Sequence, residues 1–269
     1  MLDPAFDPPF PTSGERWPDL WIAAGRASLP LSLAARRKSG GQTFVVQVQD
    51  PRLDPARFDL VIAPAHDGLA GHNVVSITGS PHRITPEGLG AAASDFAPVL
   101  AALPRPRVAV LIGGRSKAFD LTPDHAAVLA NRIAAAVQTS GGSVMLTYSR
   151  RTPGAAKTAM TERLSGLPGL IWNGEGPNPL FAMLHFADHI LVTEDSANMA
   201  AEAASTGRPV HTLPMVALKP PGKFADLHAD LRNTGAARPF DGRLETWDYT
   251  PLAETERAAR AVLEAMRRA

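Results

Sequence analysis

The stretch "VTEDSANMAAEAASTGRPV", residues 192–210, predicts a buried strand that ends in an acidic and polar turn and continues as a helix. Asp195, Ser196 and Asn198 fall where the first backbone amides of that helix have no partner within the helix. Glu202 follows further along the same helix. A strand that leads through polar residues into a helix is the repeating unit of an α/β sheet, so the same alternation should recur along the chain.

The second half of the chain repeats this alternation. Its strands are predicted at "VAVLIGG", "SVMLTYS", "LIWNG", "HILVTED" and "PVHTLP", residues 108–114, 143–149, 170–174, 189–195 and 209–214. In the helix predicted from Thr122, the apolar residues Leu129, Ile133 and Val137 recur at a spacing that places one face on a sheet. Short strands that alternate with helices predict a parallel, doubly wound sheet. We therefore assign residues 105–249 to a Rossmann-like domain.

The first half predicts a second α/β domain over residues 19–104. Its strands are expected at residues 19–25, 43–50, 59–64 and 73–78, with a helix over 29–41. Thr85 and Pro86 predict the start of a long helix, because threonine supplies a capping acceptor and proline lacks an amide that would have no partner there. We expect a Pro-rich arm over residues 1–18 and a domain boundary in the stiff linker 103–108. A final helix over 250–269 should pack back on the first half.

Composition limits the class of protein. The chain has 269 residues, 45% of them hydrophobic and 20% charged, which is typical of a globular protein. A net charge of +1 gives no reason to expect a nucleic-acid partner, although a local basic loop can still bind phosphate. The absence of cysteine excludes disulfides and thiol catalysis. No apolar run predicts a transmembrane segment or a leader, so we expect a cytoplasmic protein and leave peripheral membrane contact open.

Polar clusters follow four strands of the second half: "GGRS" (113–116), "SRRTPG" (149–154), "NGEGPNP" (173–179) and "TEDSANM" (193–199). Because ligands bind beyond the carboxyl ends of parallel strands, these loops should converge on one site for an anionic, sugar-bearing ligand. The residues expected to bind it are Gly113, Gly114, Arg115, Ser116, Ser149, Arg150, Arg151, Thr193, Glu194, Ser196, Asn198, Met199 and Glu202.

Each of these residues has both a functional and a structural interpretation. The Gly113–Gly114 pair permits close backbone approach to an oxyanion, but a glycine pair after a strand is often only a turn. The arginine pair after the second strand can hold a phosphate in forked geometry or belong to a solvated loop. Glu202 can accept two hydrogen bonds from a ribose diol or simply face solvent. Asp195 would repel a diphosphate, so its side chain should point away or hold a neighbouring loop.

The histidines and the search for known catalytic motifs give less evidence about function. His66, His72 and His82 occur in loops of the first half without the spacing of a metal site, and we expect no metal. His82 is a candidate general base, with a structural or merely exposed histidine as the alternative. His228 is assigned to a helix face. Neither a Gly-x-Ser-x-Gly elbow nor a Walker-type motif occurs, which excludes those hydrolase classes.

Several motifs together resemble a known family. They are "VAVLIGGRSKAF", "LTYSRRTP", "GPNPLFAMLHFADHILVTEDSANMAAEAASTGRPV", "GKFADLH", "PDLWIAAGRASLPLSLAARRKSGG", "VQVQDPRL", "APAHDGL" and "GSPHRIT". From Pro18 onward they resemble the bacterial and plant family named for mitochondrial fission and elongated mitochondria. The layout of the second half is also similar to GT-B glycosyltransferases. Family members usually begin with an extra strand and a glycine-containing loop, which the Pro-rich start replaces here. We therefore expect either a misassigned start codon or a shortened acceptor-side domain.

The GT-B resemblance implies two Rossmann-like domains that face a cleft, with a nucleoside-diphosphate sugar, UDP-linked, as substrate and no cofactor. In that resemblance Gly113, Gly114 and Ser116 contact the diphosphate, Glu202 contacts the ribose, and Ser196, Asn198 and Met199 contact the pyrophosphate and sugar. The resemblance implies a metal-independent glycosyltransferase with an unknown acceptor. The alternative is a non-catalytic adaptor of the mitochondrial-fission family that keeps a nucleotide-binding cleft. Epimerase chemistry is the third option, although the carboxylate or Tyr-Lys apparatus that it needs is not found.

Overall fold

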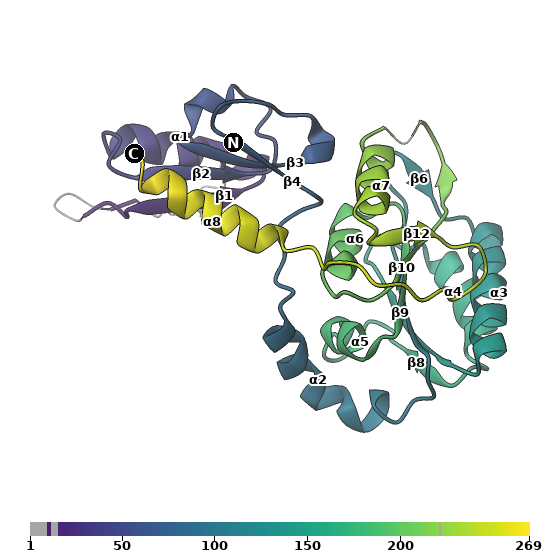
Figure 1. Ribbon diagram of the computed structural model, residues 1–269. Coiled ribbons are helices and arrows are strands. Elements are labelled where there is room, and N and C mark those ends of the chain that lie inside the picture. Colours follow the sequence, from purple (N-terminus) through teal and green to yellow (C-terminus); the bar gives the residue numbers. More distant parts are fainter. Residues whose placement is uncertain (1–9, 12–15, 221) are drawn as a thin grey trace. The chain divides into compact units, whose positions relative to one another are not determined.

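The computed structural model describes residues 10–11, 16–220 and 222–269, so most of the arm expected over residues 1–18 lies outside the described residues. The chain forms two compact units (Figure 1). Unit 1 contains the described residues up to Pro81 together with Glu254–Ala269, and unit 2 contains His82–Ala253. Each unit is built around a parallel sheet of its own.

Unit 1 has a four-stranded parallel sheet in the order β1-β2-β3-β4. The strands are β1 (Leu20–Ala24), β2 (Phe44–Val48), β3 (Leu60–Pro64) and β4 (Val74–Ile77), close to the predicted positions. Successive side chains of β2 point to opposite faces of the sheet, so Val46 packs in one apolar core and Val45 in another. The sheet is therefore covered on both faces.

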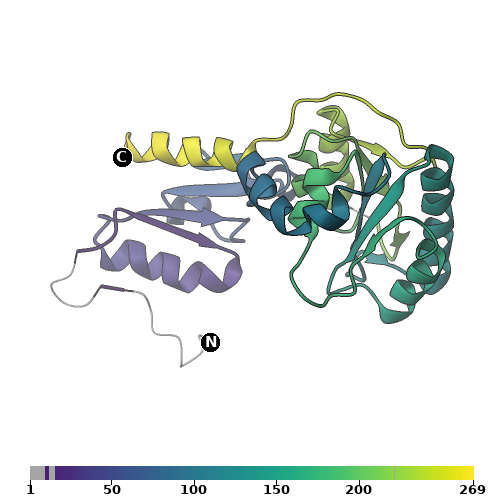
Figure 2. The ribbon, with the colours of Figure 1, turned by 90° about the horizontal axis from the view of Figure 1, so that it is seen from below.

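Two helices from opposite ends of unit 1 provide this cover. Helix α1 (Leu29–Lys38) packs on β1 and β2, and α8 (Glu254–Met266) packs on β3 and β4. Figure 2 shows the two helices on opposite sides of the sheet. Ala258 and Val262 of α8 are buried in the same core as Ile62. The expected C-terminal helix begins at Glu254 rather than Thr250.

Unit 2 has a six-stranded parallel sheet in the order β12-β10-β9-β5-β7-β8. The strands are β5 (Arg107–Ile112), β7 (Ser143–Tyr148), β8 (Gly169–Ile171), β9 (His189–Thr193), β10 (Val210–Leu213) and β12 (Ala237–Pro239). The short strands β6 (Phe119–Asp120) and β11 (Val216–Ala217) form a separate antiparallel pair. The chain builds the sheet outward from β5, first through β7 and β8 and then, on the other side, through β9, β10 and β12. This is the doubly wound topology that the sequence predicts.

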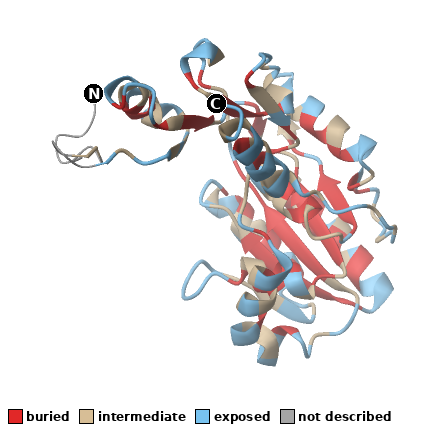
Figure 3. Cartoon of the chain, turned by 60° about the vertical axis from the view of Figure 1, so that its left-hand side comes forward, coloured by how far each residue is buried: buried red, intermediate tan, exposed pale blue. Residues whose placement is uncertain are grey.

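Six helices cover the two faces of this sheet (Figures 1 and 3). They are α2 (Pro86–Leu100), α3 (Pro123–Ser140), α4 (Gly154–Leu164), α5 (Leu180–Phe186), α6 (Ala197–Ala204) and α7 (Lys223–Asn233). Helices α3 and α4 share a core with Val110, whereas α2, α5, α6 and α7 share one with Leu111. Leu129, Ile133 and Val137 of α3 are all buried, which confirms the predicted face of that helix.

The division between the units falls at residues 81–82, not in the linker 103–108 where the sequence suggested it. The reason is the packing of α2. Leu89 and Leu100 of this helix are buried in the core of unit 2 beside Ala182 and Met183 of α5. The start of α2 agrees with the sequence, because Thr85 Oγ1 accepts a hydrogen bond from the Gly88 amide at 3.0 Å.

Candidate functional site

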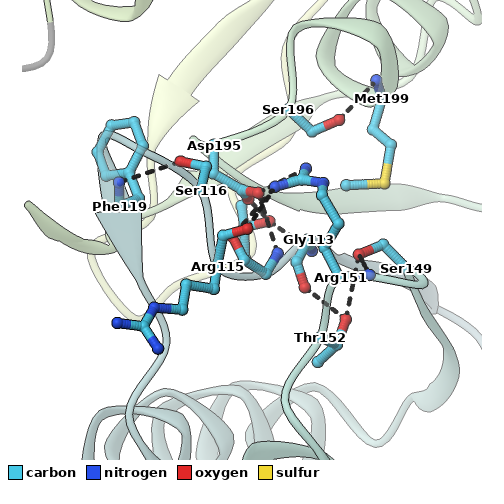
Figure 4. A network of polar contacts seen from close by, with 12 residues as sticks. Gly113, Arg115, Ser116, Phe119, Ser149, Arg151, Thr152, Asp195, Ser196 and Met199 are labelled. Carbon is cyan, nitrogen blue, oxygen red and sulfur yellow. Dashed lines mark hydrogen bonds and ion pairs between the residues drawn. The ribbon is translucent and has the colours of Figure 1, made fainter.

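Three of the four polar loops meet beyond the carboxyl ends of β5, β7 and β9 in unit 2 (Figure 4). The direction of winding reverses at β5, which pairs with β7 on one side and β9 on the other. Ligands of open α/β sheets bind at such a switch point, because the loops on its two sides diverge there. The convergence that the sequence predicts is therefore present for the loops after these three strands.

The centre of this site is the carboxylate of Asp195, whose side chain is completely buried. Its Oδ2 atom accepts a hydrogen bond from the Gly114 amide at 2.9 Å and pairs with the Arg151 guanidinium at 2.8 Å. Its Oδ1 atom accepts from the Thr193 hydroxyl at 2.7 Å. Asp195 thus joins the loops after β5, β7 and β9, which confirms the expectation that its side chain holds a neighbouring loop.

The backbone amides of Gly113 and Gly114 donate within the Asp195 network, which corrects the expectation that these amides face a ligand. The Gly113 amide donates to Thr193 Oγ1 at 2.7 Å, and the Gly114 amide donates to Asp195. A Cβ atom on Gly113 would lie 2.0 Å from Asp195 Oδ1, and one on Gly114 would lie 2.1 Å from the Arg151 carbonyl oxygen. Glycine is required here because the chain's own carboxylate and backbone approach so closely.

The two neighbouring arginines have different environments. Besides its ion pair with Asp195, Arg151 donates to the Gly114 and Arg115 carbonyl oxygens at 3.2 and 3.3 Å. Its own carbonyl oxygen accepts from the Arg115 amide at 3.1 Å. Arg150 is exposed, and within the part of the chain that the structure describes it has no hydrogen-bond or ion-pair partner. Only Arg150 of this pair presents an uncommitted guanidinium.

The loop after β7 is fixed by its hydroxyl groups. Ser149 Oγ accepts from the Arg151 amide at 3.1 Å and lies 3.3 Å from Thr152 Oγ1. Thr152, a residue that the sequence did not single out, is buried and donates its hydroxyl to the Gly113 carbonyl oxygen. It ties the loops after β5 and β7 together. Its place directly after the arginine pair was the only sequence signal for it.

In the loop after β5, the Ser116 hydroxyl stabilises the turn of the loop itself, whereas the Arg115 side chain is exposed. Ser116 Oγ accepts from the amides of Ala118 and Phe119, both at 3.1 Å, so this hydroxyl stabilises the turn. The Arg115 side chain is 71% exposed and lies 3.9 Å from Asp120. Figure 4 shows it extending away from the Asp195 carboxylate.

Helix α6 begins at this site. Ser196 is its N-cap, and its Oγ accepts from the Met199 amide at 3.4 Å. Asn198 is exposed and Met199 half-buried on the first turn. Glu202, half-buried on the next turn, has its pKa raised by burial and lowered in part by the charge of Arg83. A half-buried carboxylate on this helix remains a candidate acceptor for hydroxyl groups.

Glu194 and Thr193 hold the loop after β9 from behind. Thr193 is fully buried in the Asp195 network. The Glu194 side chain accepts from the Met215 amide at 2.8 Å, and its carbonyl oxygen lies 2.9 Å from His228 Nε2. A carbonyl oxygen can only accept, so His228 Nε2 donates this hydrogen bond, and burial lowers the pKa of the ring. The sequence placed His228 on a helix face and gave no signal for this contact.

The remaining site candidates lie apart from the Asp195 network. In the loop over residues 173–179, Asn173 and Glu175 bond to each other at 3.2 Å. Across the described residues, neither a hydrogen bond nor an ion pair joins this loop to Gly114, Arg151 or Asp195. His82 Nε2 lies 2.7 Å from Ser205 Oγ, at the opposite end of α6 from Ser196. Burial lowers the pKa of His82.

Neither a metal site nor a membrane span emerges from the described ranges. No group of three or more acidic or histidine side chains within them is arranged to hold a metal ion. None of the helices there combines the length and the apolar character needed to cross a bilayer.

Comparison with known proteins identifies the family. The sequence profile described as Mitochondrial fission ELM1 matches residues 3–266. The chain belongs to this family. The Mitochondrial fission protein ELM1 of Arabidopsis thaliana is 34% identical over 269 residues, which is 90% of this chain and 62% of the plant protein. A Rickettsia prowazekii protein is 25% identical over 93% of this chain and 80% of its own length. The chain thus spans less than two thirds of its plant relative in the family.

Solved structures show the fold class of this ELM1-family chain. The UDP-GlcNAc 2-epimerase of Methanocaldococcus jannaschii superposes with a TM-score of 0.60 at 15% sequence identity, over 92% of this chain and 77% of the epimerase. The fold is therefore α/β and GT-B-like, as the sequence resemblance implied. At this identity the likeness concerns the fold alone.

Proposed function

We propose that unit 2 binds a nucleoside-diphosphate sugar, UDP-linked, and transfers the sugar to an acceptor without a metal ion. The observation that carries this proposal is the switch-point site, where loops after β5, β7 and β9 are locked together beside the first turn of α6. A diphosphate needs positive charge and donors, and Arg150 together with the first amides of α6 would supply them. A departing diphosphate would be stabilised by the same groups.

Glu202 would bind the ribose. Its carboxylate lies on the second turn of the helix whose first turn faces the diphosphate, and it can accept two hydrogen bonds from a diol. The structural neighbour from Methanocaldococcus jannaschii is, by its name, an enzyme of a UDP-linked sugar, which favours UDP as the first nucleotide to test. The substrate sugar and the acceptor stay open.

A second candidate function is a binding protein without turnover. Three observations favour it. The amides of Gly113 and Gly114 donate to side chains of the chain itself, which leaves fewer donors for a transition state. His82, a candidate general base, is engaged with Ser205. The family also contains a plant protein named for mitochondrial fission rather than for a sugar transfer.

A thermal-shift assay tests the nucleotide site. UDP at 100 times its dissociation constant adds about 2.7 kcal/mol to the free energy of unfolding. At roughly 2–4 °C per kcal/mol, the melting temperature of the protein should rise clearly. Glu202→Ala and Ser196→Ala should each reduce this rise. ADP, GDP and inorganic diphosphate define its specificity.

The Ser196 variant needs a matched control, because it also removes a helix cap. Thr122 caps α3 in the same unit and accepts from the His125 amide at 3.2 Å. Thr122→Ala should lower the melting temperature of the protein but keep the full rise with UDP. A wild-type protein that no nucleotide stabilises, or an undiminished rise in both site variants, would refute the site. Release of UDP from a UDP-sugar would favour the transferase, and binding without release would favour the second candidate.

A further inference from the structure

Helix α6 is the attachment point for the chain as it enters unit 2. The unit begins at His82. His82 Nε2 lies 2.7 Å from the hydroxyl oxygen of Ser205, the residue that follows α6. Ser205 in turn donates its hydroxyl to the Ala201 carbonyl oxygen at 2.9 Å. The polypeptide that enters unit 2 is therefore connected to the last turn of α6 by two consecutive hydrogen bonds.

The hydrogen bonds of His82 fix the tautomer of its ring. The Ile84 amide lies 3.3 Å from His82 Nδ1, and an amide can only donate. Nδ1 is therefore the acceptor, and the ring proton resides on Nε2, which donates to Ser205. A general base needs a free acceptor nitrogen, so this arrangement makes His82 a structural connector.

The chain leaves unit 2 from the same turn of α6. The Leu252 amide donates to the Ala204 carbonyl oxygen at 3.1 Å, just before the unit ends at Ala253. The Tyr249 hydroxyl lies 3.0 Å from both the Ala204 and the Arg208 carbonyl oxygens. Both connections between the units are thus fastened to the last turn of one short helix.

The other end of α6 carries the candidate nucleotide site. Ser196 caps its first turn, and Glu202 lies on the second. Arg83, the residue after His82, acts electrostatically on Glu202. The helix has eight residues, about 12 Å at 1.5 Å per residue, so it moves as a single rigid element. A displacement at one end is therefore felt at the other.

We propose that His82 and Tyr249 are positioning residues that couple the two connections between the units to nucleotide binding at the start of α6. This inference rests on the proposed function. Coupling between two sites is reciprocal, so a nucleotide that holds the start of α6 also restrains the residues that precede and follow unit 2. A change at His82 then alters nucleotide affinity without touching the nucleotide.

Hydrogen exchange followed by mass spectrometry on the full chain tests the coupling in two steps. The first step uses no nucleotide. His82→Ala should raise amide exchange in residues 197–205 about tenfold, the effect of losing one hydrogen bond. Ser205→Ala should do the same. His82→Gln, whose side-chain amide can still donate to Ser205, should restore most of the protection. His72→Ala is the control, because that histidine is exposed and belongs to unit 1, and should leave this exchange unchanged.

The second step adds saturating UDP. In the wild-type protein UDP should slow exchange in residues 193–199 and also in residues 78–85 and 246–253. In His82→Ala the protection of 193–199 should persist at higher UDP concentrations, while that of 78–85 is lost. Tyr249→Phe should lose the protection of 246–253 selectively.

The outcomes separate the two proposals. Protection of 193–199 in the wild-type protein without any change at 78–85 and 246–253 overturns the coupling and keeps the nucleotide site. Unchanged exchange of 197–205 in His82→Ala overturns the coupling whether or not UDP binds. A wild-type protein that UDP protects nowhere overturns the nucleotide site, and with it the coupling to a nucleotide.

Discussion

Replacing Asp195 with alanine should destabilise unit 2 more than any other single change at the candidate site. The substitution removes a completely buried carboxylate and the acceptor of the Gly114 amide, the Thr193 hydroxyl and the Arg151 guanidinium. These groups bind three different loops together. Their loss should therefore affect both the folding of the unit and any ligand that these loops hold.

The size of the effect follows from the exposure of each partner. The Gly114 amide and the Thr193 hydroxyl are buried, and a buried donor without an acceptor costs about 1–3 kcal/mol. The Arg151 side chain is 43% exposed, so water can solvate its charge and its loss adds less. Together we expect a decrease of about 3–5 kcal/mol in the free energy of unfolding of unit 2, the range for breaking a buried ion pair. Asp195→Asn keeps the shape and one acceptor and should cost less, about 1–3 kcal/mol.

Urea unfolding followed by far-UV circular dichroism measures these differences, with separate midpoints fitted if the two units unfold separately. Glu162→Ala is the control, since Glu162 lies 3.9 Å from Arg163 with 67% of its side chain exposed and should change the free energy of unfolding by less than about 0.5 kcal/mol. An Asp195→Ala protein within about 1 kcal/mol of the wild type would refute the assigned role of this carboxylate.

Three further predictions concern the same unit. Arg150→Ala should leave the free energy of unfolding within about 0.5 kcal/mol but weaken UDP binding at least about tenfold by calorimetry, whereas equal binding would exclude this arginine from the site. Gly113→Ala should lower the free energy of unfolding by more than about 2 kcal/mol, because its Cβ would overlap Asp195. Gly90→Ala, which has open space in α2, should instead raise the free energy of unfolding by about 0.5–1 kcal/mol. Similar effects of the two substitutions would contradict the close approach at Gly113. Burial, reinforced by the charge of His189, lowers the pKa of His211 from 6.5 to about 4, so the folded state binds fewer protons than the unfolded state. Up to about 3 kcal/mol of unfolding free energy, fully present above pH 6.5, should therefore be lost as the pH falls toward 4. His211→Leu should flatten this pH dependence in urea titrations.

The fold followed from the sequence because its determinants are local and periodic. The apolar run of β5 and the spacing of Leu129, Ile133 and Val137 in α3 depend only on neighbours along the chain, and both occur as predicted. The caps at Thr85, Thr122 and Ser196 are likewise set by the residues that follow them. Such features can be predicted without knowledge of tertiary contacts.

The domain boundary did not follow, because it depends on a tertiary contact. Residues 103–108 have the composition of a linker, but β5 already begins at Arg107. Helix α2 packs on α5, about eighty residues further along the chain, and no local pattern records that partner. The boundary therefore moved to residues 81–82, on the other side of α2.

The candidate site was predicted in its position but not in its hydrogen bonds. The end of each strand locates a loop, so the convergence of Gly114, Arg151 and Asp195 could be inferred from topology. Which donor meets which acceptor depends on side-chain positions within a few tenths of an ångström. Thr152 and His228 enter the site through such contacts, and a sequence offers no periodic signal for them.

The charges of the network make a buried carboxylate compatible with the proposed diphosphate site. Alone, Asp195 would repel the ligand, but its charge is balanced by Arg151 at 2.8 Å. Arg150 is then left with an unbalanced positive charge at the same edge of the sheet, and the exposed Arg115 adds to it. The two adjacent arginines thus differ in role: Arg151 neutralises the carboxylate that orders the loops, and in the proposed function Arg150 would attract the anion. The two arginines cannot exchange these positions, because Arg151 is anchored by Asp195 and two backbone carbonyl oxygens, whereas Arg150 has no such anchor among the described residues.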